Sequence, residues 1–414
     1  MQLATDPSTR KRGIRAFHGI VGLGIVVMVG LGSLTSFGGS SPTAKKVSQA
    51  PQVQAPVLGA TIVIGYNDLG MHCINQDFSE IMVLPPFNNL HAQVIDRGIE
   101  PHIVTSGVTL TYTIPSNTHS VDKCNFWSFA QPLLGTALAP NIGLTGNGMS
   151  GSLVRTLSND YAVTGIPITP IDDFGRENPF ALATITVKRS GAVVTRTQAV
   201  VPVSWEMSCN LCHKTPGIST ATDILRAHDK LHGTTLEQQK PVLCARCHAD
   251  PALGQPGVAG VSNLSHAMHS AHAPRMSQAS LAVPCYACHP GLRTKCLRDV
   301  HSDRGMNCMT CHGDMTAMAV STRRPWVDEP RCGSCHIRSG FEFEQANTLY
   351  KDSRGHMGVQ CEACHGSTHA IAPATTATDN VQANALQGYS GPISRCTVCH
   401  VTQPSDSFPH KLND

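Results

Sequence analysis

The stretch PCYACHPGLRTKCLRDVHSDRGMNCMTCHGDM, residues 284–315, contains the pattern Cys-x-x-Cys-His twice. The same pattern occurs seven times in the second half of the chain. The paired cysteines are Cys209 and Cys212, Cys244 and Cys247, Cys285 and Cys288, Cys308 and Cys311, Cys332 and Cys335, Cys361 and Cys364, and Cys396 and Cys399. The histidines that follow are His213, His248, His289, His312, His336, His365 and His400. A repeated chemical motif, rather than apolar periodicity, therefore organises this half of the chain.

The spacing of the motif explains its chemistry. Two thiols three residues apart lie on one helical turn and can add to the two vinyl groups of a haem, while the next histidine binds the iron. Zinc ribbons also use Cys-x-x-Cys pairs, but zinc does not require a histidine directly after the second cysteine. A disulfide framework does not require it either, and seven matches are far beyond chance when histidine is 21 of 414 residues. The sequence predicts seven covalently bound haem c groups with these seven histidines as proximal ligands.

Further histidines could close the opposite side of each iron. Nine more lie among residues 209–414, and seven irons need seven sixth ligands. His228 and His232 share one helix face at i,i+4, so only one of them, His228, is expected to ligate. The candidate distal ligands are His228, His269, His272, His301, His356, His369 and His410. A methionine at one site stays an alternative, and it would raise that haem's potential.

Irons with a protein ligand at both axial positions favour electron transfer over catalysis, because an enzyme haem keeps one axial position free. The chain also contains no Cys-x-x-Cys-Lys variant of the motif. We therefore assign no catalytic residue. The haem region, residues 206–414, has only about 29 residues for each haem, too few for a conventional core. The porphyrins are expected to form its core and to lie close together.

The N-terminal region indicates export. Basic residues precede an apolar stretch, Ile20–Leu31, of a length typical of a secretory signal and short for a membrane span. Residues 1–40 are predicted to be a signal peptide, with an uncleaved membrane anchor as the alternative. Only as an uncleaved anchor would this segment bring the protein into contact with a membrane. Residues 41–59, rich in Pro, Gln and Ala, are predicted to be a linker. The remainder is expected in the periplasm, on the outer surface or outside the cell.

Residues 60–205 carry the alternating pattern of β-strands. The clearest piece is ATITVKR, residues 183–189, followed by Ser190-Gly191 and AVVTRTQAVVPV, residues 192–203, which predicts a hairpin. We expect an all-β domain, a β-sandwich, before a mostly irregular haem domain with short helices. Cys73 and Cys124 could form a disulfide there, while Cys296 is left over. The order of residues around Cys73 does not fit a blue-copper site.

Composition excludes other classes. Aromatic residues make up only 5% of the chain, and the formal charge of +3 provides no basic excess for nucleic-acid binding. Histidines outside the haem region, such as His91 and His102, are expected to be ordinary core or surface residues. His72, in the β region, is a weaker candidate ligand for a haem at the domain boundary.

The chain resembles the secreted multihaem c-type cytochromes of respiring bacteria. The resemblance rests on the seven motifs, on residues 225–254 and 284–315, and on YNDLGMHC (66–73), MVLPPFNNLHAQV (82–94) and NFWSFAQPLLG (125–135) in the β region. It implies electron transfer to redox partner proteins or extracellular acceptors. Two alternatives remain open: a subunit that self-associates into an extracellular filament, and a reductase of a small nitrogen or sulfur oxyanion.

Overall fold

The computed structural model describes residues 56–341, 343–406 and 409–410. The predicted export segment and most of the predicted linker lie outside them. Within them no helix is long and apolar enough to cross a membrane. The strands are β1 (Thr61–Tyr66), β2 (His72–Cys73), β3 (Ile81–Met82), β4 (Leu90–Asp96), β5 (His102–Ile103), β6 (Thr109–Thr113), β7 (Ser150–Arg155), β8 (Tyr161–Val163), β9 (Phe180–Arg189), β10 (Ala192–Ser204) and β11 (Val242–Leu243).

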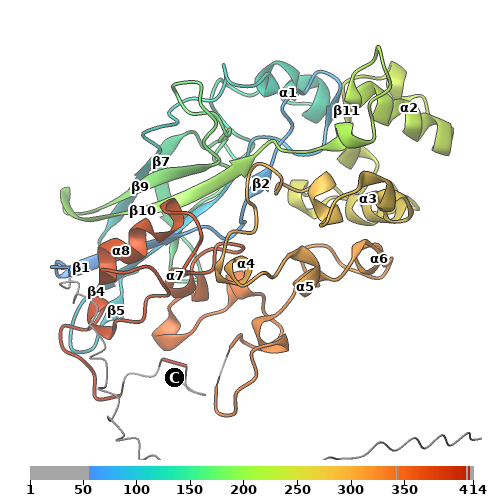
Figure 1. Ribbon diagram of the computed structural model, residues 1–414. Helices are drawn as coiled ribbons and strands as arrows, with labels where there is room; N and C mark the ends of the chain where they lie inside the picture. Colours follow the sequence, from blue (N-terminus) through green and yellow to red (C-terminus); the bar gives the residue numbers. More distant parts are fainter. Residues whose placement is uncertain (1–55, 342, 407–408, 411–414) are drawn as a thin grey trace, which may run out of the picture. The chain divides into compact units, whose positions relative to one another are not determined.

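Nine of these strands form one sheet that curls into a half-barrel (Figure 1). Its order is β1, β4, β8, β7, β6, β9, β10 and β2, with β5 paired to β4. The structure confirms strands before short helices, but the predicted β-sandwich is not confirmed, because these strands belong to one continuous sheet. Gly65 in β1 allows the curl: a Cβ there would lie 2.7 Å from Ile185 and 3.0 Å from Ala199, on the facing strands.

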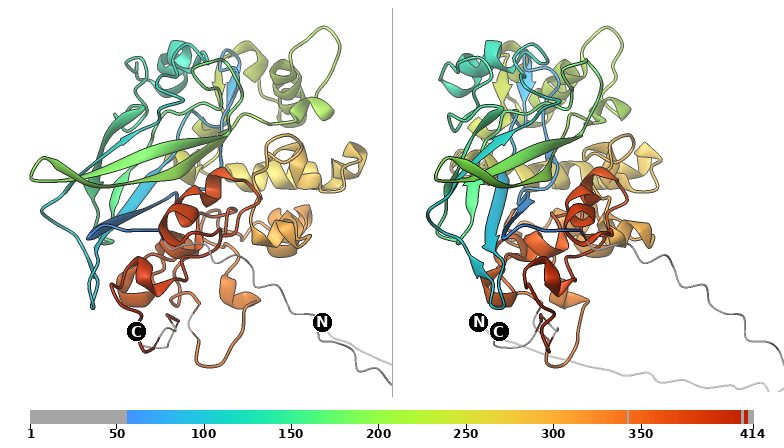
Figure 2. Two further views of the ribbon diagram at one scale, coloured as in Figure 1. Left: turned by 60° about the vertical axis from the view of Figure 1, so that its left-hand side comes forward. Right: turned by 90° about the vertical axis from the view of Figure 1, so that its left-hand side faces the viewer.

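The predicted hairpin is present as β9 and β10. Arg189 pairs with Ala192 across Ser190 and Gly191, which both have positive φ angles, as a two-residue turn of type I′ requires. Alternate residues of β9 are buried, since one face of the strand covers the core. The tip of this hairpin points away from the helices of the second half (Figure 2).

The helices are short, apart from α2. They are α1 (Phe126–Leu134), α2 (Thr220–His232), α3 (Leu264–His272), α4 (Val300–Asp303), α5 (Cys308–His312), α6 (Met315–Met318), α7 (Cys361–His365) and α8 (Val381–Gln387). Side-chain N-caps start several of them, such as Asp314 before α6, and glycines follow α5 and α7, as at Gly313 and Gly366. Frequent caps and glycines thus keep these helices short.

Among the described residues, the sheet and the motif-bearing segment pack together in one compact unit. Ile62 and Ile64 of β1 share a hydrophobic cluster with Leu386 of α8 and Val398 of the last motif. Arg97, after β4, donates to the carbonyl oxygens of residues 397 and 398. The division into a strand domain, 60–205, and a haem domain, 206–414, stays a prediction.

A buried ionic cluster lies on the sheet. His91 Nδ1 is 2.8 Å from Asp160 and its Nε2 is 3.4 Å from Asp68, while the Tyr66 hydroxyl donates to Asp160 at 2.7 Å. Burial alone would lower the pKa of His91, but the hydrogen bond to Asp160 and the nearby negative charge of Asp68 overcome it and raise the pKa to about 10. His91 therefore serves the sheet as a cation between two carboxylates, in line with the expectation that it is not a haem ligand.

This cluster predicts a pH dependence of stability. A pKa raised from 6.5 to about 10 on folding stabilises the fold fully below pH 6.5, and the contribution disappears as the pH rises through 10. The free energy of unfolding should therefore fall between pH 7 and pH 10, as measured by denaturant titration at several pH values. In His91→Gln the fall over this window should be smaller, and an unchanged slope would contradict the assignment.

Candidate haem sites

Each Cys-x-x-Cys-His motif forms a single helical turn. The backbone N–H of the motif histidine donates to the backbone carbonyl of the first cysteine, at 2.9 Å in the Cys209 and Cys285 motifs and 3.1 Å in the Cys244 motif. Two motifs are short α-helices, α5 and α7. One helical turn brings residues i and i+3 to the same face, so the two thiols of a motif point in the same direction. This is the local geometry that thioether attachment to a haem needs.

None of the seventeen cysteines of the chain forms a disulfide. The disulfide considered between Cys73 and Cys124 is therefore absent from the structure. Cys73 lies instead close to Cys296: burial raises the pKa of its thiol, and the neighbouring Cys296 adds to that effect. Cys124 packs in a separate hydrophobic cluster around Phe126. The sequence argument failed because it paired the two cysteines of the strand region, whereas Cys73 faces the segment before the fourth motif.

Every motif histidine faces a second histidine. The distances between ring centres are 6.4 Å for His213 and His272, 6.3 Å for His248 and His228, 6.2 Å for His289 and His269, 6.2 Å for His312 and His369, 6.1 Å for His336 and His301, 5.6 Å for His365 and His410, and 6.2 Å for His400 and His356. The seven partners are the seven histidines proposed from the sequence as distal ligands.

These distances allow a test of whether an iron fits. An imidazole nitrogen binds a first-row metal ion at about 2.0–2.1 Å and lies about 1.1 Å from its ring centre, so two imidazoles on opposite sides of one ion have ring centres about 6.3 Å apart. Six of the pairs match this spacing. His365 and His410 are closer, with their Nε2 atoms 3.4 Å apart, so an iron between them needs a small outward movement of His410. The residues present fit bis-histidine haem sites.

Hydrogen bonds orient several of these rings. Nδ1 of His248, His269, His272 and His400 lies 2.7–2.9 Å from a backbone carbonyl oxygen. A carbonyl oxygen only accepts, so Nδ1 carries the hydrogen and Nε2 keeps the lone pair that a metal binds. Burial lowers the pKa of His289 to about 4, which keeps this ring neutral. The four rings with carbonyl partners are held in the tautomer that ligates iron through Nε2.

The remaining histidines of this region face no motif histidine. His232 is exposed and its ring centre lies 4.7 Å from that of His228, too close for an iron between the two. His266 precedes the two paired histidines on α3, and its Nδ1 is buried without a hydrogen-bond partner. His72, a weaker candidate, is buried and its Nε2 is 2.9 Å from the Pro85 carbonyl, which occupies the nitrogen that a haem would need.

Helix α3 links two of the sites. It carries His269, which faces His289 of the third motif, and His272, which faces His213 of the first motif. Residues three apart on a helix are separated by about 4.5 Å along its axis. The first and third sites are therefore neighbours.

Helix α2 links the first site to the second. It carries His228, which faces His248 of the second motif. Asp223, in its first turn, accepts hydrogen bonds from the backbone and hydroxyl of Thr215, two residues after His213. The second site thus lies beside the first.

The fourth and fifth sites follow the third. Cys308 of the fourth motif lies beside Cys285 of the third, close enough to raise the pKa of that thiol. The backbone N–H of Arg298 donates to the carbonyl of His369, the partner at the fourth site, at 2.9 Å. Three residues later the same segment supplies His301 to the fifth site. This segment therefore joins the fourth site to the fifth.

The last two sites complete the series. Tyr350 donates from its hydroxyl to the Gly366 carbonyl, directly after the sixth motif, at 2.7 Å. Burial raises the pKa of Tyr350, and nearby acidic groups and thiols, including Cys332 of the fifth motif, add to it. The Ile393 N–H, three residues before the seventh motif, donates to the Cys364 carbonyl at 2.8 Å. Contacts thus connect the sites in the order second, first, third, fourth, fifth, sixth and seventh.

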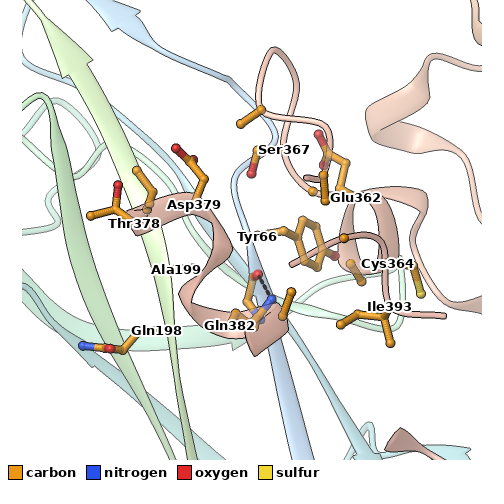
Figure 3. A pocket seen from close by; sticks show the side chains of 18 residues that line it. Tyr66, Gln198, Ala199, Glu362, Cys364, Ser367, Thr378, Asp379, Gln382 and Ile393 are labelled. Carbon is orange, nitrogen blue, oxygen red and sulfur yellow. Dashed lines mark hydrogen bonds between the residues drawn. The ribbon is translucent and has the colours of Figure 1, made fainter. Parts of the chain in front are cut away.

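A small hollow lies between the sheet and the sixth motif (Figure 3). Its lining includes Tyr66 of β1, Gln382 of α8, and Glu362 and Cys364 of α7. Glu362 occupies a variable position of the motif but is buried, and burial raises its pKa well above the usual range, with Asp68 adding to the effect. The sequence reasoning did not single out Glu362, although an acidic residue inside the motif is visible there.

Comparison with known proteins is consistent with this geometry. Residues 315–366 match the family model described as cytochrome c554 and c-prime. The matched segment contains the fifth and sixth motifs and His356. No curated protein and no solved structure matches the chain. The match supports a c-type cytochrome, a protein that carries electrons with covalently bound haem c.

Proposed function

We propose that this chain is a seven-haem c-type cytochrome that carries electrons between redox partners. The observation that carries the proposal is the set of seven motif histidines, each opposite a second histidine at a spacing that suits iron or nearly does so. Two histidines on one iron leave no position for a substrate, which favours electron transfer over the reductase alternative. Haem iron supplies one-electron chemistry.

The contacts between neighbouring sites support a single series of haems, with the second and seventh motifs at its ends. Both end motifs lie against the strand region: Arg246 donates to the Pro132 and Leu133 carbonyls of α1, and His400 Nδ1 to the Ile99 carbonyl. The strand region would thus hold the two ends of the series in place. Export, through the signal in residues 1–40, would put the protein in the periplasm, on the outer surface or outside the cell.

The first test is the number and state of the haems. Mass spectrometry of the purified mature protein should show seven haem additions, because each of the seven motifs places its two cysteines on one helical turn. Electron paramagnetic resonance of the oxidised protein should show low-spin ferric iron throughout. A substantial high-spin signal at neutral pH would mean an open site, and would favour the reductase alternative instead.

A further inference from the structure

One of the histidine partners is bound by a carboxylate. Asp299 Oδ2 is 3.0 Å from Nδ1 of His301, the partner of His336 at the fifth site. Its Oδ1 accepts the backbone N–H groups of His301 and Ser302, both at 2.9 Å, and so caps α4. Asp299 is only 4% exposed. The carboxylate is therefore held rigidly, away from water, on the ring nitrogen opposite the one that would ligate iron.

No lysine or arginine in the described part of the chain forms an ion pair with this carboxylate. Its neighbour Arg298 is fully buried, but it pairs with Asp379 through two hydrogen bonds of 2.7 and 2.8 Å. The negative charge of Asp299 consequently acts on His301 without a competing cation. In a site of low polarity, such a charge-assisted hydrogen bond is stronger than a neutral one.

Six of the other paired histidines have neutral partners at Nδ1. They are the Thr234 hydroxyl for His228, backbone carbonyls for His248, His269, His272 and His400, and the Cys296 thiol for His369. Glu329 lies 3.9 Å from Nδ1 of His312, beyond hydrogen-bond distance, and already pairs with Arg323 at 3.0 Å. The fifth site is therefore chemically distinct from these.

We propose that Asp299 is a positioning residue that lowers the reduction potential of the fifth haem by increasing the electron donation of His301 to iron. A carboxylate that accepts the Nδ1 hydrogen raises the basicity of the imidazole, and this stabilises ferric over ferrous iron. The inference rests on the proposed function, because it needs a haem at this site. Since the contacts place the fifth site inside the series, Asp299 would lower the reduction potential of a haem that electrons cross on their way between the two ends.

The test is Asp299→Asn in the full holoprotein, followed by a redox titration at one pH. Asparagine is a good N-cap, so its oxygen can keep the backbone hydrogen bonds of Oδ1. Its NH2 group then lies beside Nδ1 of His301 and cannot accept, so the variant removes both the charge and the hydrogen bond to the ring. The largest rise in potential should be at one haem, whose ratio of reduced to oxidised form at a fixed applied potential increases about tenfold, equivalent to about 59 mV for one electron. A smaller rise is expected at the fourth site, because His369 also lies near the Asp299 charge. The matched control is Asp314→Asn, because Asp314 caps α6 through the Ala317 N–H, and α6 carries no paired histidine.

The outcomes separate this proposal from the function on which it rests. If the wild-type protein lacks seven haems, the proposed function is wrong. If Asp299→Asn holds seven haems and titrates as the wild type and the control do, the tuning role is wrong. If only Asp299→Asn loses a haem, the residue is a structural cap and the proposal is overturned. In a background without the fifth haem, Cys332→Ala with Cys335→Ala, the largest shift should disappear, and its persistence would also overturn the assignment.

Discussion

Replacing His228 with alanine should convert one of the seven haems from a low-spin, six-coordinate state to a high-spin, five-coordinate state. His228 is half-buried on α2 with its ring centre 6.3 Å from that of His248, the histidine of the second motif. Its Nδ1 is 2.9 Å from the Thr234 hydroxyl, which holds the ring in place. Without this ring the second iron would have one axial position open to water or to an added ligand such as cyanide or carbon monoxide. The ferric electron paramagnetic resonance spectrum should show about one seventh of the iron as high-spin.

The chain provides a matched control one helical turn away. His232 lies on the same helix, but it is exposed and faces no motif histidine. His232→Ala should therefore leave all seven haems low-spin. For His232 to replace His228 as ligand, α2 would have to move along its axis by about 6 Å. A high-spin signal in His232→Ala, or a fully low-spin spectrum in His228→Ala, would contradict the pairing of His228 with the second motif.

The local part of the site could be predicted from the sequence, whereas the pairing could not. A motif of five residues determines its own helical turn, and the i,i+4 spacing of His228 and His232 indicates by itself that only one of them ligates. In contrast, His369 faces His312 across 57 residues that include two other motifs. His410 likewise faces His365 across 45 residues. Such contacts depend on the tertiary path of the chain, and the spacing of residues in the sequence does not determine that path.

For the sheet too, the sequence predicted the local structure but not how distant segments come together. The alternating pattern of β9 identified a half-buried strand and the Ser190-Gly191 turn identified its hairpin, both of which are local features. A sandwich and a curled half-barrel give the same alternation, so the pattern did not distinguish them. The difference depends on β1 lying across β10, which a close approach at Gly65 permits. In the sequence, Gly65 is simply a glycine near the end of a strand.

The buried pair of Arg298 and Asp379 predicts the largest loss of stability. Arg298 is fully buried and forms two hydrogen bonds to Asp379, a third of 3.0 Å to the Cys296 carbonyl, and a cation–π contact with Phe180 at 4.9 Å. Arg298→Met should leave Asp379 as an uncompensated buried charge and cost about 3–5 kcal/mol. Thermal and denaturant unfolding of the holoprotein would measure it. The control is Arg324→Met, because Arg324 forms an exposed pair with Asp328 and its loss should change the free energy of unfolding little.

A double substitution separates the charge from the packing. In Arg298→Met with Asp379→Leu no buried charge remains, so the variant should be more stable than Arg298→Met alone, although it has lost both partners. A double variant less stable than the single one would mean that the hydrogen bonds themselves, and not the unpaired buried carboxylate, determine the loss of stability.

The position of the Arg298–Asp379 pair adds a second readout. Arg298 joins Phe180 of β9 to the segment whose backbone holds the His369 carbonyl at 2.9 Å. If this connection positions His369, Arg298→Met should also weaken ligation at the fourth site and give a high-spin signal there, which the Arg324→Met control should lack.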